Sequence, residues 1–227
     1  MIGIIAAMEE EMSILREALE SSEGFKKCGM TFYECELEGQ TIILTVCGVG
    51  KVNAAMAATI MISEFNCELI INTGIAGGIN NVQTRDVIIG SKLMYHDVDV
   101  TPFGYDYGQV PGLPKYFTPD LSSIVLIKKS LNELNIPYKE ATIYSGDIFV
   151  NKLESLSNVD ISGTVISEME GAAIAHVCVK SGVDFVVLRF VSDVVGSENQ
   201  INDYMAFEEE MARRSSTICL EILKRIA

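Results

Sequence analysis

Acidic side chains follow three separate strand-like runs of this sequence. Glu11 closes an acidic triplet after an apolar run, and Glu170 lies in the segment SEMEG at the end of another. A third run holds Arg189 and is followed by Asp193. Ligands of α/β proteins bind beyond the carboxyl ends of the strands, so we expect these groups to meet at one site. Three carboxylates beside one arginine can stabilise a developing cation and move protons.

Each of these groups also has a purely structural interpretation. Acidic residues at a helix N-terminus are favoured by the helix dipole, which accounts for the triplet that ends at Glu11. Glu170 is placed to cap the helix that follows it, and Arg189 is placed to pair internally with either acid. The arrival of all these groups at strand ends favours a catalytic site over separate structural roles.

Short β-rich runs alternate with helical patterns along the whole chain, which predicts an α/β layer structure with no linker. Strands are expected at residues 2–7, 30–38, 41–47, 69–73, 86–97, 140–145, 164–167 and 184–192, and helices at 9–21, 51–64, 121–134, 171–181 and 205–226. The hairpin at 30–47 is expected to turn at Gly39 and Gln40, and the strand at 69–73 to end at the glycine-rich segment 74–78. Residues 101–119 hold four of the five prolines and are expected to form a long functional loop.

The composition narrows the class of protein. Of the 227 residues, 48% are hydrophobic and 21% are charged, which is typical of a folded globular domain. The net charge of −14 repels nucleic acid and anionic membrane surfaces, and no apolar run approaches the roughly 18 residues of a membrane span. Six cysteines without a C-x-x-C pair and only two histidines give no framework for a zinc site. The scattered thiols and the lack of a basic leader indicate a cytoplasmic protein.

The glycine-rich turn at 48–50 does not match a phosphate-binding motif. Thr45 and Val52 stand where a P-loop needs a glycine and a hydroxyl residue, and Asn53 replaces the third glycine of a dinucleotide fingerprint. The segment is therefore interpreted as a tight turn between a strand and a helix. The G-x-S-x-G motif of serine hydrolases is also missing from the sequence.

Short segments spread over essentially the whole chain occur in the order IGIIAAMEEE, GVGKVNAA, INTG, YHDVDVT, FGY, YGQ, SGD, FVN, EME and SD. In these segments and in their order, the sequence resembles the bacterial 5′-methylthioadenosine/S-adenosylhomocysteine nucleosidases. This family belongs to the nucleoside phosphorylase-like superfamily, so the resemblance implies a single domain over residues 1–227. It also implies a three-layer α/β/α sandwich with a central mixed, partly barrel-like sheet, and a reaction without cofactor or metal.

The resemblance implies catalytic roles for three residues. Glu11 is expected to be the general base that activates water, with Arg189 nearby to position it. Asp193 is expected to act as the acid or hydrogen-bond donor at N7 of the purine. An acid at the purine and carboxylates around the sugar are what cleavage of an N-glycosidic bond requires.

Substrate-binding residues are implied in the same way, at Met8, Ala76, Gly77, Phe149, Val150, Met169, Glu170, Ser192 and Tyr204. Glu170 is expected to hold the ribose hydroxyls above Met169, and Phe149 to stack on adenine beside the backbone of Val150. Tyr204 is preferred over Phe207 as the aromatic lid, because the spacing of Phe207 places it in the core.

The proline-rich loop is expected to complete the site of a second subunit in a homodimer. By resemblance, Val100, Phe103 and Pro111 cross the interface to line the alkylthio pocket of the partner. Self-packing of the loop is the alternative interpretation. One departure from the family lies at Ile75, where the family usually has serine, so a hydroxyl near the sugar and the water is missing.

The resemblance implies a hydrolase that releases adenine from 5′-methylthioadenosine or S-adenosylhomocysteine. Three alternatives stay open: an aminodeoxyfutalosine nucleosidase, a phosphate-dependent purine nucleoside phosphorylase, and a catalytically silent nucleoside-binding module. Glu11 favours hydrolysis over phosphorolysis, because a carboxylate repels phosphate and activates water. The sequence does not rank the 5′ substituents, since Met8, Val49 and apolar loop residues accept several.

Overall fold

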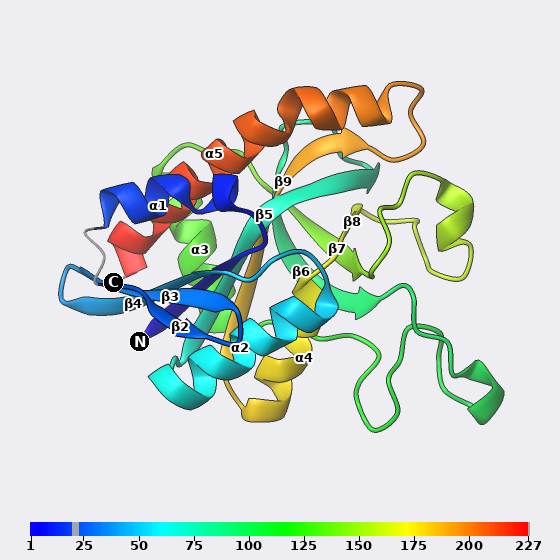
Figure 1. The fold of residues 1–227 in the computed structure, drawn as a ribbon. Coiled ribbons are helices and arrows are strands. Elements are labelled where there is room, and N and C mark those ends of the chain that lie inside the picture. Colours follow the sequence, from blue (N-terminus) through cyan, green and yellow to red (C-terminus); the bar gives the residue numbers. More distant parts are fainter. Residues whose placement is uncertain (20–22, 227) are drawn as a thin grey trace.

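The computed structural model describes residues 1–19 and 23–226. Within them, nine strands form one sheet with helices on both faces (Figure 1). The strands are β1 (Ile2–Ala6), β2 (Phe25–Lys27), β3 (Met30–Leu37), β4 (Gln40–Val46), β5 (Leu69–Asn80), β6 (Val87–Tyr95), β7 (Lys139–Ser145), β8 (Val165–Glu168) and β9 (Asp184–Val194). The α-helices are α1 (Ser13–Ala18), α2 (Lys51–Phe65), α3 (Leu121–Glu133), α4 (Gly171–Ser181) and α5 (Gln200–Ile226). Short 3₁₀ helices are η1 (Glu9–Glu11), η2 (Thr101–Phe103) and η3 (Leu153–Leu156).

Five of the strands close into a barrel. The sheet order is β2-β3-β4-β1-β5-β8-β7-β6-β9, and β5 also pairs with β9, which joins the two ends of the β5-β8-β7-β6-β9 set. β1 and β9 run parallel to β5, whereas β8 runs antiparallel to it. The central mixed, partly barrel-like sheet is therefore confirmed.

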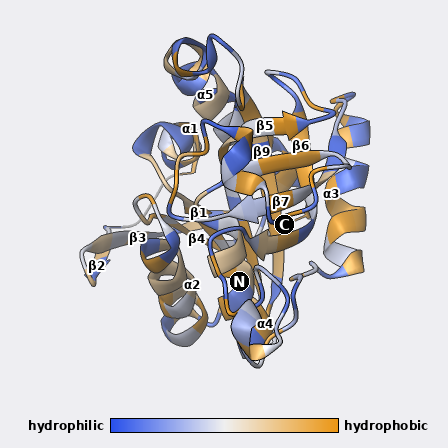
Figure 2. Cartoon of the chain, turned by 90° about the vertical axis from the view of Figure 1, so that its right-hand side faces the viewer, coloured by the Kyte–Doolittle hydropathy of each residue, from blue (hydrophilic) through white to orange (hydrophobic). Residues whose placement is uncertain are grey.

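Helices cover the two faces of the sheet in separate groups. Ala57 of α2 and Ile174 of α4 belong to one buried apolar cluster with Ile70 of β5. Ile222 of α5 belongs to a second cluster, with Leu188 of β9 and residues of α1 and α3. Figure 2 shows the apolar strands between these layers, so the three-layer α/β/α arrangement is confirmed. No helix in the described part of the chain is long and apolar enough to cross a membrane.

A register shift between β5 and β9 sets the direction of the side chains near the end of β9. Gly77 of β5 lies opposite Asp193, and the register between the two parallel strands shifts between Ala76 and Gly77. Successive residues of a regular strand point to opposite faces, and an irregularity of this kind changes that alternation. Ser192 and Asp193 consequently line the same cavity although they are neighbours in the chain.

Strand β5 continues through the glycine-rich segment that we expected to end it, and runs to Asn80. The glycines serve close approach rather than a turn. A Cβ atom on Gly74 would lie 2.6 Å from Oε1 of Glu11, and one on Gly78 would lie 2.6 Å from Cγ2 of Val82. The glycines at 74–78, which we interpreted as a turn, therefore allow tight packing within a continuous strand.

Other boundaries also differ from expectation. The hairpin turns at Glu38 and Gly39, both at positive φ, one residue before the expected pair. Helix α5 begins at Gln200 instead of 205, because polar contacts rather than apolar spacing hold its first turn. The helix expected at 9–21 is divided into η1 and α1, and residues 20–21 lie outside the described part. Strand β2 has largely exposed side chains and so left no burial pattern to predict it.

Candidate active site

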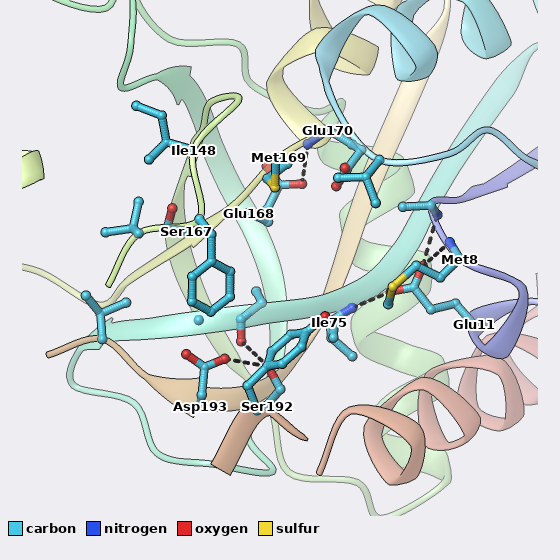
Figure 3. A pocket seen from close by; sticks show the side chains of 18 residues that line it. Met8, Glu11, Ile75, Ile148, Ser167, Glu168, Met169, Glu170, Ser192 and Asp193 are labelled. Atoms are coloured by element: carbon cyan, nitrogen blue, oxygen red, sulfur yellow. Dashed lines mark hydrogen bonds between the residues drawn. The ribbon is translucent and has the colours of Figure 1, made fainter. Parts of the chain in front are cut away.

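A cavity of about 100 Å³ lies beside β5 and the ends of β8 and β9 (Figure 3). Eleven of the residues that line it, from distant parts of the chain, were suggested by the sequence. They are Met8, Glu11, Ala76, Gly77, Phe149, Val150, Met169, Glu170, Ser192, Asp193 and Tyr204.

Glu11 is anchored by backbone groups from two segments. Its Oε2 accepts hydrogen bonds from the N–H groups of Ala7 and Met8 at 2.9 and 3.1 Å, and its Oε1 accepts from the N–H of Ile75 at 2.9 Å. Because Ile75 contributes its backbone, an isoleucine side chain leaves this contact intact. Burial raises the pKa of the Glu11 carboxyl, while these donors and the charge of Arg189 oppose the rise. A carboxyl with a fixed orientation and a raised pKa can exchange a proton with a bound water.

Arg189 lies behind the wall of the cavity and is not among the residues that line it. Its Nη2 donates to Oε2 of Glu168 and to Oδ1 of Asn72, both at 2.5 Å, and lies 4.0 Å from Oε2 of Glu170. Burial opposes the charge of the guanidinium, but the carboxylates of Glu168, Glu170 and Glu11 raise its pKa. Arg189 therefore acts on Glu11 through its charge, and its direct partners are Glu168 and Asn72.

Glu168 and Glu170 flank the start of α4 and divide their contacts differently. Oε2 of Glu168 accepts from the N–H groups of Glu170 and Gly171 at 3.0 and 2.7 Å, and its Oε1 accepts from the hydroxyl of Ser145. Oε1 of Glu170 accepts from the N–H of Gly50 at 2.8 Å, which gives the glycine turn at 48–50 a structural role. Burial and the neighbouring charge of Glu168 raise the pKa of Glu170. Both carboxylate oxygens of Glu168 thus accept hydrogen bonds from groups of the protein itself.

Asp193 is buried in the cavity wall, on the other side of the cavity from Glu11 (Figure 3). Its Oδ1 accepts from Oγ of Ser192 at 2.7 Å, and its Oδ2 accepts from Nε2 of Gln200 at 2.8 Å. Burial raises the pKa of Asp193, the two donors lower it, and the charge of Asp203 raises it further. Asp193 therefore holds a proton to higher pH than an exposed aspartate does.

Two aromatic rings line the cavity. Phe149 and Tyr204 pack edge to face, with 5.4 Å between ring centroids and planes at 81°. The hydroxyl of Tyr204 donates to Glu208 at 3.1 Å. Phe207 packs against the second apolar cluster under the guanidinium of Arg85, 4.7 Å from the ring centroid. Of the two aromatic candidates on α5, the cavity is lined by Tyr204 and the core is joined by Phe207.

The loop residues expected to serve a second subunit do not line the cavity of their own chain. Phe103 is 81% exposed, Pro111 is exposed, and Val100 is half-buried. The loop that carries them extends away from the barrel, with η2 near its tip (Figure 1). The prediction assigns these residues to the cavity of a second subunit, so within one chain they are expected to lie apart from the cavity.

Some residues at the cavity were missing from the expected set. Ala7, Ile148 and Glu168 line the cavity, and each adjoins a residue that was expected there. Ser167 and Val195 also line it, each two residues from an expected one. Adjacency to the motifs was the signal that would have found them. Gln200, which bonds Asp193, lies seven residues away in the chain and had no such signal.

Known proteins match this chain along its whole length. The family described as "Phosphorylase superfamily" matches residues 1–224. The 5′-methylthioadenosine/S-adenosylhomocysteine nucleosidase of Bacillus subtilis (strain 168) is 38% identical over 229 residues, which cover 99% of each chain. The enzyme of that name from Neisseria meningitidis, solved with methylthio-immucillin-A, has a TM-score of 0.92 at 37% identity and 98% coverage of both chains. The futalosine hydrolase of Helicobacter pylori strain 26695 has a TM-score of 0.90 at 30% identity, covering 98% of this chain and 96% of its own. The chain belongs to the phosphorylase superfamily and, within it, to the 5′-methylthioadenosine/S-adenosylhomocysteine nucleosidases.

Proposed function

We propose that this protein hydrolyses the N-glycosidic bond of 5′-methylthioadenosine and S-adenosylhomocysteine, releasing adenine and the thioribose product. The observation that carries the proposal is the convergence of Glu11, Glu170 and Asp193 on one cavity. The names of the relatives from Bacillus subtilis and Neisseria meningitidis support the same reaction.

Asp193 is the acid in the proposed mechanism. Breaking the glycosidic bond moves its electrons onto the purine, so a proton delivered at N7 stabilises the departing base. The burial that raises the pKa of Asp193 keeps that proton available. Ser192 supports the carboxyl, and Phe149 and Tyr204 enclose the base beside the backbone of Val150.

The sugar becomes cationic as the bond breaks, and the carboxylates stabilise that positive charge. Glu170 holds the ribose hydroxyls, and Met169 packs beneath the ring, while Met8, Ala76 and Gly77 complete the wall. Interactions that strengthen as positive charge develops lower the barrier rather than only the Michaelis constant.

Glu11 takes the proton of the attacking water. Three backbone N–H groups hold its carboxyl in one orientation, and the charge of Arg189 behind it favours the ionised base. Arg189 is thus a positioning residue that acts through the buried carboxylates.

Water rather than phosphate is the proposed nucleophile. None of the described residues that line the cavity is a lysine or an arginine. The guanidinium of Arg189 is already paired with Glu168, and Glu11 stands on the side from which a nucleophile would attack. A phosphate dianion there would meet repulsion from carboxylates that a water molecule does not meet.

A homodimer is the proposed assembly, with Val100, Phe103 and Pro111 closing the 5′ end of the partner's cavity. The exposed ring of Phe103 lies in the same loop as Val98 and Val110, which line a largely apolar hollow beside α2 and α4. Val52 of α2, 70% exposed, stands at that hollow. Covering this surface with a second copy in a two-fold contact removes apolar area from water.

The expected domain organisation and the expected location of the protein are part of the same proposal. One nucleoside phosphorylase-like domain over residues 1–227 agrees with a family match over 1–224. The six cysteines are free thiols, which supports a reducing cytoplasmic location.

Aminodeoxyfutalosine is a second candidate substrate, because structures named futalosine hydrolase are among the similar proteins. The test is adenine release measured with 5′-methylthioadenosine, S-adenosylhomocysteine, aminodeoxyfutalosine and adenosine. Fastest release from the two thio nucleosides supports the proposal, and fastest release from aminodeoxyfutalosine transfers it to that substrate. Binding of the nucleosides without adenine release identifies a silent binding module.

A further inference from the structure

Gln200, the first residue of α5, is buried next to the cavity without lining it. Its side chain carries a primary amide, and the residue is only 4% exposed. A buried amide destabilises a fold unless its donors and its acceptor find partners. The hydrogen-bond partners of the Gln200 amide therefore indicate what the side chain does in the structure.

All the polar atoms of the Gln200 side chain are engaged. Nε2 donates to Oδ2 of Asp193 at 2.8 Å and to the backbone oxygen of Val150 at 2.9 Å. Oε1 accepts from the N–H of Gly196 at 2.9 Å. A reversed amide would place Oε1 against two acceptors and Nε2 against a donor, so these neighbours fix which end faces Asp193.

We propose that Gln200 is a positioning residue, which holds Asp193 in the orientation for proton transfer and ties it to the backbone that borders the purine. Val150 follows Phe149, whose ring lines the cavity, so one amide links both sides of the purine region. This inference rests on the proposed function.

The two oxygens of Asp193 have unequal neighbours. Gln200 can only donate to Oδ2, whereas the hydroxyl of Ser192 lies 2.7 Å from Oδ1 and 3.3 Å from the backbone oxygen of Ala76. When Oδ1 carries a proton, that hydroxyl can turn toward Ala76 and remain bonded. Gln200 therefore assigns the transferable proton to Oδ1.

The charged surroundings of Asp193 determine how its titration responds to Gln200. Among the described residues, Asp203 and Tyr204, both on α5, are the titratable groups that act on it or respond to it, and β5 and residues 148–150 present uncharged groups. The amide of Gln200 lowers the pKa of Asp193 against the effect of burial. Removing the amide must raise that pKa, so the acid stays protonated to higher pH.

The test is the pH profile of adenine release from 5′-methylthioadenosine by Gln200→Leu. We expect kcat to fall by about tenfold or more, and the alkaline limb of the profile to move up by about one pH unit. Asn202→Leu, at an exposed position of the same helix, is the matched control and keeps both values of the wild type. The pH of the alkaline limb is the deciding measurement, because the loss of a merely structural residue would lower kcat without moving that limb.

A second variant keeps the inference testable if Gln200→Leu does not fold. Gln200→Glu preserves the size of the side chain and places a second carboxyl beside Asp193. Like charges disfavour ionisation of the pair, so the alkaline limb again moves to higher pH. An alkaline limb that stays at the wild-type pH in the folded variant overturns the role of Gln200, whatever happens to kcat.

The wild-type enzyme separates this inference from the function on which it rests. If the wild type releases no adenine from any of the candidate nucleosides, the proposed function fails. If the wild type is active and the limb does not move in the Gln200 variants, only the role of Gln200 fails.

Discussion

The wall of the cavity and the proline-rich loop at 101–119 differ in how they hold the residues that we expect to contact substrate. Glu11 is 2% exposed and receives three backbone hydrogen bonds from segments fixed by β1 and β5. Phe103 of the loop is 81% exposed. Strand pairing positions a side chain within one chain, whereas an exposed ring gains free energy only when another surface covers it. We infer that the central sheet, together with η1 at the end of β1, supplies the chemistry, and we propose that assembly supplies the selectivity for the 5′ group.

The largest loss is expected at the wall, from Asp193→Asn. Asparagine keeps the size of the side chain but has no acidic proton, so kcat for adenine release should fall by roughly 10²–10⁴-fold. Thermal unfolding measured beside it should stay near that of the wild type. Turnover close to the wild-type value in the folded variant would remove Asp193 from the mechanism.

Gly74→Ala tests whether close packing fixes the base. The added methyl group would lie 2.6 Å from Oε1 of Glu11, so the carboxyl must move, and a displacement of this order lowers kcat by about 10²-fold. Gly163→Ala is the matched control, because a Cβ atom at Gly163 meets nothing within 4 Å. Equal activity of the two variants would contradict the close fit around Glu11.

Phe103→Ala tests the other side of the comparison. We expect binding of 5′-thio nucleosides to weaken by roughly 1–3 kcal/mol, with a smaller effect on adenosine, because one apolar contact is lost at the 5′ end. The KM values of the two substrates measure the difference. Sedimentation of the wild type at assay concentration provides the control, since a fully active monomer would refute a shared cavity.

Ile75→Ser should have the smallest effect. The backbone N–H of residue 75, not its side chain, holds Glu11, so the variant should fold and keep turnover within about tenfold, or roughly 1.4 kcal/mol in activation free energy. Steady-state kinetics with 5′-methylthioadenosine measures this. A folded but inactive variant would place the isoleucine side chain in a different, essential role.

The sequence predicted those parts of the molecule that depend on local pattern. Carboxylates at strand ends were expected to meet, and Glu11, Glu170 and Asp193 do line one cavity. The alternation of strands and helices led to the correct class of fold, since buried strands and amphipathic helices have different apolar spacing.

Long-range geometry was beyond the reach of that pattern. Closure of the barrel depends on the pairing of β5 with β9, which no local spacing encodes. The glycines at 74–78 looked like a turn because composition does not distinguish a bend from close approach. Gln200 was missed because a polar residue before an apolar helix looks like an exposed one until its partners are known.

The most direct test of the chemistry assigned to the wall is the dependence of the reaction on phosphate. Purified protein is incubated with 5′-methylthioadenosine with and without phosphate, and both adenine and the sugar product are identified. We predict equal adenine release in the two buffers and a free methylthioribose product, because carboxylates rather than cations border the site of attack. Release that requires phosphate and yields a sugar 1-phosphate would contradict this account.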